Sequence, residues 1–358
     1  MTNPSFWKNK RVFITGHTGF KGAWLCKILE LFGARIYGYA LEPATQPNLF
    51  SLCDFDIESF IRDIRDFDAL QRAMNIAEPE IVIHMAAQPL VLDSYKDPKY
   101  TYEVNVMGAV NLLECVRGSD SVRAVLNVTT DKVYLDLNRE EGYQEDERLN
   151  GYDPYSNSKS CSELVTSCFI NSFFKRKDIA VSTARSGNVI GGGDFSANRI
   201  IPDCARALAR GERISVRNPF SIRPYQHVLD TLFAYLLIVE KQYEDKSVAG
   251  AYNIGPDADG CATTGDLANY FCAAWGDGAS WEHTPTDLPH ESALLTLDCS
   301  KIKRALGWEP VWDIKEATAA SAQWYKLFYG NEDTKAETMK QIKAFAARYL
   351  DKSMTKAV

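Results

Sequence analysis

Short runs of apolar and β-branched residues alternate with amphipathic stretches through the first half of the chain. The continuous apolar character of these runs predicts strands buried on both faces, at residues 11–15, 35–39, 81–84, 124–128 and 179–184. The stretches between them have the periodicity of helices, at 24–32, 66–75, 102–115 and 160–173. This alternation predicts a parallel, doubly wound α/β sheet with ligand-binding loops at the carboxyl ends of its strands.

The alternation loosens after about residue 185. The elements predicted beyond it are a strand at 251–254 and helices at 200–210, 229–242, 263–274, 313–329 and 334–358. Asp313, followed three residues later by a glutamate, is a suitable N-cap for the helix at 313–329. We expect a sheet-forming domain of residues 1–185 plus about 226–255, and a smaller domain of about 186–225 plus 256–350.

The composition excludes several classes of protein. No apolar run approaches the roughly 20 residues that a membrane-spanning helix needs, and the N-terminus lacks the pattern of a secretion signal. The nine cysteines are dispersed and have no histidine at metal-ligand spacing, which argues against disulfides and a bound metal. A formal net charge of −7 offers no basic surface for nucleic acid. We therefore expect a cytoplasmic protein that holds anionic ligands with a few local arginines.

A glycine-rich turn follows the first predicted strand and opens the first predicted helix. Its sequence is Thr15-Gly16-His17-Thr18-Gly19-Phe20-Lys21-Gly22. Gly16 permits a tight turn, Gly19 lets the backbone approach a pyrophosphate, and Gly22 allows close helix–strand packing. The free N–H groups and positive dipole of the helix N-terminus then face the phosphates. In this position the turn predicts a dinucleotide-binding site.

Tyr155 and Lys159 stand four residues apart, so on a helix they share one face, one turn apart. A tyrosine can take the proton of a substrate hydroxyl while hydride leaves the carbon, provided that its pKa falls from about 10 to about 7. This change takes roughly 4 kcal/mol, and one ammonium at about 4 Å supplies a Coulomb energy of that order at an effective dielectric near 20. The pair is a candidate for catalysis of hydride transfer.

The spacing Gly-x-x-Gly-x-x-Gly, with Tyr-x-x-x-Lys and this chain length, resembles the extended branch of the short-chain dehydrogenase/reductase superfamily. The resemblance implies a Rossmann-type NAD-binding domain, a smaller C-terminal substrate-binding domain and a structural role for Asn105. The cofactor-binding residues that it implies are Gly16, Thr18, Gly19, Phe20, Gly22, Asp63, Ile64, Ala86, Ala87, Gln88, Thr129, Tyr155 and Lys159. Residues 38–42 contain no arginine for a 2′-phosphate, which favours NAD over NADP, and they also lack the expected ribose-binding aspartate.

The segment Thr130-Asp131-Lys132, after the strand predicted at 124–128, resembles the Thr-Asp-Glu loop of nucleotide-sugar 4,6-dehydratases, with lysine in place of glutamate. The resemblance spans roughly residues 11–308 and implies CDP-glucose as the substrate, in the synthesis of a deoxysugar for a polysaccharide such as an O-antigen. It implies oxidation at C4 with Tyr155 as base and Thr130 on the oxygen, elimination of water across C5 and C6 with Asp131 as acid, and hydride return to C6.

Lys132 has two open roles in this scheme. As the base for the C5 proton it must be neutral, so its pKa must fall from about 10.4 to near 7. As a charged group it would instead stabilise the enolate while another group takes the proton. The alternative interpretation is that Lys132 is an ordinary surface lysine after a strand, without a role in catalysis. Its position beside Thr130 and Asp131 disfavours this alternative.

Four further residues are expected to hold the nucleotide sugar: Asn188, Arg199, Arg223 and Asn253. Arginine suits this task because its planar fork binds two phosphate oxygens at once, whereas His227 is expected to be structural. The resemblance also implies a homodimer through the helices near 102–115 and 160–173, or a dimer of such dimers. Two other readings stay open, namely a dehydratase or epimerase for another nucleotide sugar and a non-catalytic NAD-sensing protein.

Overall fold

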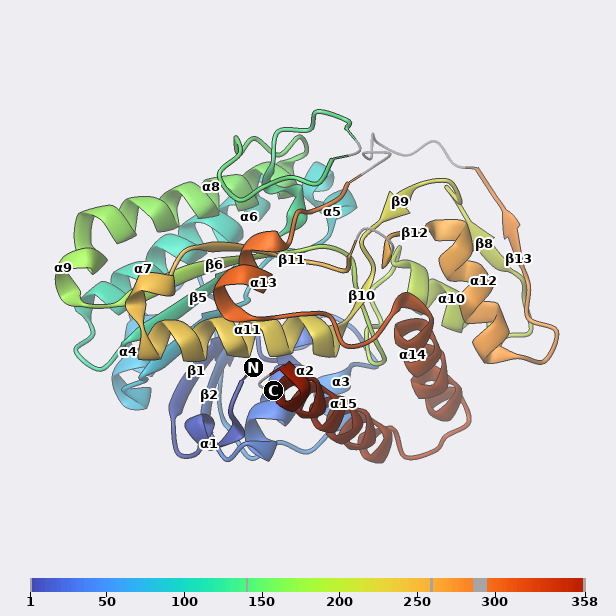
Figure 1. The fold of residues 1–358 in the computed structure, drawn as a ribbon, viewed down its shortest axis with the longest axis horizontal. Helices are drawn as coiled ribbons and strands as arrows, with labels where there is room; N and C mark the ends of the chain where they lie inside the picture. The colour runs from blue at the N-terminus through green and yellow to red at the C-terminus, as the bar shows by residue number, and fades with distance from the viewer. Residues whose placement is uncertain (1, 140, 258–259, 286–294, 357–358) are drawn as a thin grey trace.

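The computed structural model, which describes residues 2–139, 141–257, 260–285 and 295–356, has a central sheet of seven parallel strands (Figure 1). In order across the sheet these are β11 (Ala251–Ile254), β6 (Ala180–Ser186), β5 (Ala124–Val128), β4 (Ile81–His84), β1 (Arg11–Thr15), β2 (Arg35–Ala40) and β3 (Glu58–Ile61). Strands β1 to β3 are added toward one edge of the sheet and β4 onward toward the other. Ligands of doubly wound folds bind at this switch point, between β1 and β4. The predicted fold class is confirmed.

Helices cover both faces of the sheet, as the two-sided burial of its strands requires. On β1, Val12 and Ile14 point to one hydrophobic core, whereas Phe13 points to the other. The first core includes α1 (Pro4–Trp7), α2 (Phe20–Leu31), α3 (Leu49–Leu52) and α11 (Val228–Glu244). The second includes α4 (Phe67–Ala77) and α7 (Gly108–Gly118).

The apolar runs predict six of the seven strands of the central sheet to within two residues, but they do not predict β3. This strand is the sheet edge, and none of its four residues is fully buried. An edge strand of this kind leaves no continuous apolar run in the sequence, which explains the omission.

The helix that carries Tyr155 begins earlier than the predicted 160–173. It is α8 (Pro154–Phe169), and it continues as the π-helical segment η3 (Ile170–Phe174) and α9 (Lys175–Lys177). Proline occupies its first position, and the carboxylate of Asp153 accepts a hydrogen bond from Ser156 N at 3.0 Å. Both features favour a helix start here, so Tyr155 stands in the first turn.

The helix predicted at 102–115 is likewise divided, into α6 (Pro98–Tyr102), the π-helical segment η1 (Glu103–Met107) and α7. Two short helices flank these elements, α5 (Val91–Lys96) after β4 and the 3₁₀ turn η2 (Asp131–Val133) after β5. A further 3₁₀ turn, η4 (Lys246–Val248), follows α11.

A second group of elements lies beside the carboxyl ends of the strands, on the right of Figure 1. Its strand pairs are β7 (Val189–Ile190) with β10 (Gln226–His227), β8 (Ile214–Val216) with β13 (Trp281–His283), and β9 (Ile222–Arg223) with β12 (Ala262–Thr263). Its helices include α10 (Ile200–Ala209), α12 (Thr264–Trp275) and α14 (Ile314–Tyr329), and α13 (Ser300–Leu306) lies nearer β11. The predicted cap of α14 is present, because Asp313 and Glu316 form a capping box.

The last helix, α15 (Thr334–Lys356), returns to the side of the sheet that α2 and α11 cover (Figure 1). The ring of Tyr349 lies 4.9 Å from that of Phe233 on α11, and its hydroxyl accepts a hydrogen bond from Thr2 N at 3.3 Å. The division into two domains at the predicted boundaries stays a prediction. No helix among the described residues is long and apolar enough to cross a membrane.

Asp230 at the start of α11 makes the stability of this core depend on pH. Its Oδ1 accepts a hydrogen bond from Val311 N at 2.6 Å, whereas its buried Oδ2 has no hydrogen-bond partner among the described residues. Burial raises the pKa of Asp230 to about 7. The unfolded chain ionises at lower pH, so it binds fewer protons than the folded protein between about pH 4 and 7. This group therefore costs stability as the pH rises through that window.

Replacement of Asp230 by asparagine keeps the acceptor for Val311 N and removes the ionisation. Above pH 7 we expect Asp230→Asn to unfold at higher urea concentration than the wild type, with a free energy of unfolding higher by at most about 4 kcal/mol. Near pH 4 the two proteins should unfold at more similar urea concentrations. Urea titrations at both pH values measure this difference. Parallel pH dependence in the two proteins would contradict the assignment.

Candidate active site

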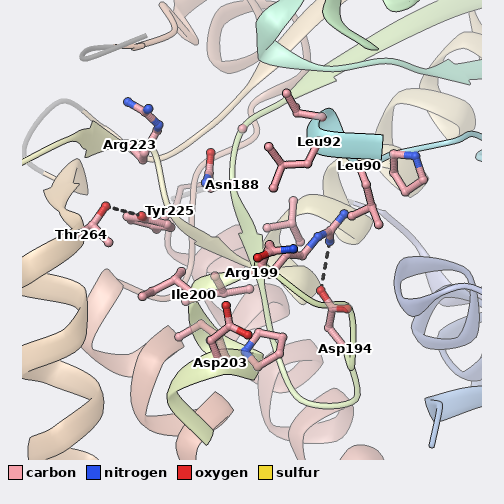
Figure 2. A pocket seen from close by; sticks show the side chains of 18 of the residues that line it. Leu90, Leu92, Asn188, Asp194, Arg199, Ile200, Asp203, Arg223, Tyr225 and Thr264 are labelled. Carbon is pink, nitrogen blue, oxygen red and sulfur yellow. Dashed lines mark hydrogen bonds and ion pairs between the residues drawn. The ribbon is translucent and has the colours of Figure 1, made fainter. Parts of the chain in front are cut away.

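A cavity of about 680 Å³ opens between the carboxyl ends of the strands and the second group of elements (Figure 2). It brings together predicted site residues that lie up to 203 positions apart in the sequence, from Phe20 to Arg223. The predicted site residues that line it are Phe20, Thr129, Thr130, Asp131, Lys132, Tyr155, Asn188, Arg199 and Arg223. The predicted acid–base loop and the predicted phosphate-binding arginines thus share one cavity.

The loop after β5 presents a hydroxyl and a carboxyl to this cavity. The Thr130 hydroxyl donates a hydrogen bond to Asp131 Oδ1 at 2.9 Å, and Oδ2 of the same carboxyl has no partner among the described residues. Burial raises the pKa of Asp131, although Lys132 and Thr130 oppose the shift. A carboxyl that tends to keep its proton is suited to act as an acid.

Tyr155 and Lys159 lie one turn apart on α8, as predicted. Tyr155 lines the cavity, while Lys159 is buried behind it and donates from Nζ to Val128 O at 3.0 Å. Burial raises the pKa of Tyr155 to about 12, against a hydrogen bond with Thr130 that lowers it. Burial also lowers the pKa of Lys159 to about 7, and nearby Lys21 adds to this effect. The tyrosine thus needs more stabilisation of its phenolate than its ordinary pKa suggests.

The glycine-rich turn has the geometry that a diphosphate requires. Gly16 has a φ of +79°, and a Cβ on Gly22 would stand 2.1 Å from Gly16 O. Among the described residues, a Cβ on Gly19 would meet nothing nearer than 3.4 Å, so its bare face is open to a ligand. Gly19 is also the N-cap of α2 and has no side-chain cap, which leaves the first N–H groups of that helix for an anion.

Two side chains hold the loops next to this turn. Thr18 donates from Oγ1 to Leu41 O at 2.8 Å, which fixes the turn to the end of β2. Asn105, in the π-helical segment η1, accepts from Gln88 N at 2.8 Å and donates to Ser158 Oγ at 2.9 Å. The predicted structural asparagine therefore joins the loop after β4 to helix α8, which carries Tyr155 and Lys159.

The predicted cofactor-binding residues Asp63 and Ile64 lie after β3 and away from the large cavity. Asp63 forms an ion pair with Arg65 at 2.8 Å, and hydrogen bonds from Arg65 hold the pKa of Asp63 below its usual range. Ile64 is buried against Gly108, where a Cβ would stand 2.8 Å from its side chain. Ala86 N donates to Thr15 Oγ1 at 3.1 Å, and neither Ala86 nor Ala87 lines the large cavity. The roles of these four residues toward a cofactor stay predictions.

The cations predicted for phosphate lie in the second group of elements. Figure 2 shows Asn188 between Arg223 and Arg199, and Arg199 forms an ion pair with Asp194 at 3.0 Å. Arg223 on β9 is buried and donates from its guanidinium to Ile222 O at 2.9 Å.

Asn253 requires a correction. It is fully buried outside the cavity, donates from Nδ2 to Tyr143 O at 2.7 Å and accepts from the Tyr134 hydroxyl at 2.6 Å. These bonds tie β11 to the segment after η2, so the structure gives Asn253 a structural role in place of the predicted substrate contact. His227 caps α11 by accepting from Leu229 N at 3.2 Å, in agreement with its predicted structural role.

Other residues of the cavity were not predicted from the sequence. They include Lys21, Leu90, Leu92, Asp203, Tyr225 and Thr264. Lys21 carries a usable signal, because it is the one cation inside the glycine-rich turn, and burial lowers its pKa to about 8. The Tyr225 and Thr264 hydroxyls lie 3.0 Å apart across two segments that no sequence pattern connects (Figure 2).

A family model described as GDP-mannose 4,6 dehydratase matches residues 13–320. The chain belongs to this family. A CDP-glucose 4,6-dehydratase of Salmonella typhimurium is 44% identical over 341 residues, which cover 93% of this chain and 95% of the relative. A dTDP-glucose 4,6-dehydratase of Xanthomonas campestris pv. campestris is 27% identical over 336 residues, which cover 87% and 92%.

Two solved structures show that the fold is shared across this group of enzymes. A UDP-glucose 4-epimerase of Thermotoga maritima, solved with UDP-glucose, has a TM-score of 0.77 at 21% identity and covers 88% of this chain and 99% of its own. A dTDP-glucose 4,6-dehydratase of Streptomyces venezuelae, solved with NAD and TYD bound, has a TM-score of 0.76 at 23% identity, with coverages of 90% and 98%. At these identities the likeness concerns the fold alone.

The close approach of Gly22 to Gly16 predicts a sharp effect of one methyl group. We expect Gly22→Ala to lower the free energy of unfolding by about 1–3 kcal/mol, because α2 must move away from the turn. The displaced N–H groups should weaken NAD+ binding about tenfold or more. Gly118→Ala is the control, since no atom of the residues that the structure describes lies within 4 Å of a Cβ there. Chemical denaturation and calorimetric titration measure both effects, and equal affinities in the two variants would contradict the packing argument.

Proposed function

We propose that this protein is a CDP-glucose 4,6-dehydratase, which converts CDP-D-glucose to CDP-4-dehydro-6-deoxy-D-glucose and water with NAD+ as its cofactor. The observation that carries the proposal is one cavity lined by Tyr155, by the Thr130–Asp131–Lys132 loop and by the arginines suited to a diphosphate. The relative of 44% identity over nearly the whole chain supports the choice of CDP-glucose.

The glycine-rich turn fits NAD+ as a resident cofactor. The open N–H groups at the start of α2 and the bare face of Gly19 suit a pyrophosphate. The end of β2 and the residues after it contain no arginine for a 2′-phosphate, which favours NAD+ over NADP+. When bound, NAD+ would supply the oxidising equivalent at C4 and the reducing equivalent at C6, so the reaction is redox-neutral overall.

In the oxidation at C4, Tyr155 takes the proton of the C4 hydroxyl. Thr130, hydrogen-bonded to the same tyrosine, is suited to hold the substrate oxygen. Lys159 stabilises the phenolate from behind while its Nζ stays bound to Val128 O. A positioned base of this kind typically contributes about 10²–10⁴-fold to the rate.

In the elimination, a base takes the C5 proton while the C6 hydroxyl leaves and is protonated to water. Asp131 protonates the departing hydroxyl, a role that its raised pKa supports. Lys132 lines the same cavity next to it, either as the base for C5 or as a cation beside the enolate oxygen. Both roles require its amino group at the reacting end of the sugar.

The diphosphate and the assembly complete the proposal. Arg199, Arg223 and Asn188 hold the diphosphate, a local cationic site in a chain with a net charge of −7. The protein acts in the cytoplasm as a homodimer, in deoxysugar synthesis, without nucleic acid or membrane partners. Met107 on η1 and Leu164 on α8, which are 50% and 57% exposed, support a dimer interface over these helices.

Mass spectrometry of CDP-glucose incubated with the protein and NAD+ in deuterated water tests the reaction. We expect a product that has lost one water and gained one solvent deuterium at C5, without net NADH. An inverted C4 centre at unchanged mass would mean an epimerase. Turnover of another nucleotide sugar alone would overturn the choice of CDP-glucose, and no turnover of any would favour an NAD-sensing protein.

A Lys132→Met variant separates the two halves of the reaction. We expect NAD+ to be reduced at C4, seen as absorbance at 340 nm, while product with the lost water forms about 10²-fold or more slowly. Tyr155→Phe is the control, because it should block the oxidation itself. Unimpaired dehydration by Lys132→Met would contradict both roles of this lysine.

A further inference from the structure

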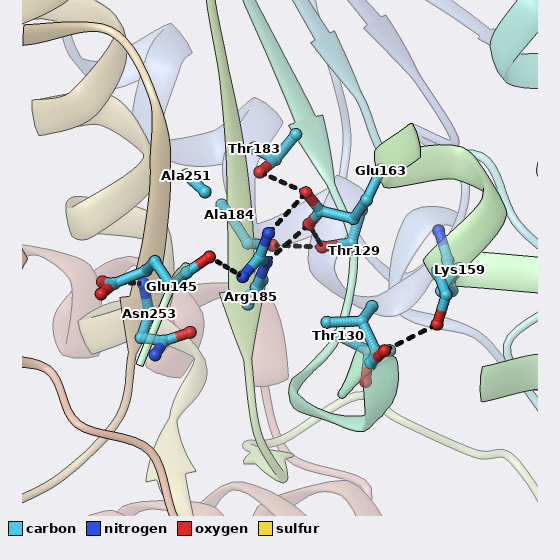
Figure 3. Close-up of polar contacts among 12 residues, drawn as sticks. Thr129, Thr130, Glu145, Lys159, Glu163, Thr183, Ala184, Arg185, Ala251 and Asn253 are labelled. Atoms are coloured by element: carbon cyan, nitrogen blue, oxygen red, sulfur yellow. Dashed lines mark hydrogen bonds and ion pairs between the residues drawn. The ribbon is translucent and has the colours of Figure 1, made fainter. Parts of the chain in front are cut away.

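A buried ion pair lies next to the loop after β5 that begins with Thr130, Asp131 and Lys132, which we call the catalytic loop (Figure 3). Glu163 of α8 and Arg185 of β6 are each only 4% exposed in their side chains. The guanidinium donates twice, from Nε to Glu163 Oε1 and from a terminal nitrogen to Oε2, both at 2.9 Å. A bidentate pair of this kind fixes both side chains in one geometry.

Glu163 also fastens the backbone from which the catalytic loop begins. Its Oε1 accepts from the Thr129 hydroxyl at 2.6 Å, and its Oε2 accepts from the Thr183 hydroxyl at 2.7 Å. One turn earlier on the same helix, Lys159 donates to Val128 O. Helix α8 thus binds the last residue of β5 and the residue that follows it, and the next residue is Thr130, which faces the cavity.

Arg185 extends this hydrogen-bond network to the residues that follow the loop after β5. A second terminal nitrogen donates to the Tyr134 hydroxyl at 2.8 Å and to Glu145 O at 2.9 Å (Figure 3). These contacts hold the segment that follows the catalytic loop. All four hydrogen-bonding positions of the Glu163 carboxylate are therefore satisfied, which is the condition for burying a charge.

The same carboxylate acts on the charge of Lys159. The charged groups that act on Lys159 are Glu163 on its own helix and Lys21 on α2, and Lys159 in turn acts on His84 of β4. Burial and Lys21 lower the pKa of Lys159, and Glu163 is the group that raises it. Lys159 must be charged to stabilise the Tyr155 phenolate, so Glu163 favours the active form of the pair.

We propose that Glu163 is a positioning residue, which fixes Thr129 beside the catalytic loop and supplies the anion that keeps Lys159 charged. The inference rests on the proposed function only through the role of Tyr155 as a base. Neither Glu163 nor Arg185 lines the cavity, so neither touches the substrate there.

The test measures the ionisation of Tyr155 directly in the NAD+-loaded protein. Phenolate absorbance near 295 nm is titrated with pH, and the Tyr155→Phe form of each variant supplies the background of the other tyrosines. We expect Glu163→Gln to move phenolate formation up by about one pH unit and to slow single-turnover oxidation at pH 7 about tenfold. The doubly neutral variant Glu163→Gln/Arg185→Gln, which leaves no unpaired buried charge, should show the same shift.

Thr166→Val is the matched control. Thr166 lies on the next part of the same helix, is fully buried and accepts from Asn127 Nδ2 of β5 at 2.8 Å. Its loss should lower stability without moving the Tyr155 titration. An unchanged titration in both Glu163 variants, or an equal shift in Thr166→Val, would overturn the proposal. Because the titration needs no substrate, it stays decisive even if CDP-glucose proves not to be the substrate.

Discussion

The packing of helix α8 against the end of strand β5 determines the geometry of the whole active site. Lys159 binds Val128, the last residue of the strand, and Glu163 binds Thr129, which follows it. The strand itself is held in register by parallel neighbours on both sides, β4 and β6. The loop that starts at Thr130 therefore leaves from fixed backbone. Since Tyr155 stands one turn before Lys159, the same packing directs its ring to that loop.

The main energetic problem of the site is to form a phenolate in a buried environment. A tyrosine with its ordinary pKa near 10 would need about 4 kcal/mol of stabilisation to ionise near pH 7. Burial raises the pKa of Tyr155 to about 12, and the requirement then grows to about 7 kcal/mol. One ammonium at about 4 Å supplies only about 4 kcal/mol. Lys159, itself partly neutral near pH 7, is therefore insufficient alone, and the remainder falls to the positive nicotinamide ring and to groups that keep Lys159 charged.

The sequence predicts those parts of the molecule whose burial is apolar. The strands of the sheet interior are examples, and the glycine-rich turn follows from its place between a strand and a helix. The start of α8 could not be predicted in this way, because its buried face is polar and hydrogen-bonded. Ser158 binds Asn105, and Ser160 binds Gly151 N. Glu163, Arg185 and Asn253 escape it as well, since a polar residue in a sequence gives no sign that it is buried and fully hydrogen-bonded.

The fold by itself does not decide the reaction, because an epimerase and a dehydratase share it. Interconversion at C4 needs only a base and a hydride acceptor, and in the proposed mechanism the Tyr155–Lys159 pair would serve both reactions. Asp131 distinguishes them. Its carboxyl is buried, its pKa is raised, and its Oδ2 finds no partner among the described residues. Such a group costs free energy in the folded protein. A buried acid at the cavity wall, such as Asp131, is useful to a dehydration, because the departing hydroxyl needs a proton. An inversion at C4 expels no hydroxyl and has no use for such an acid.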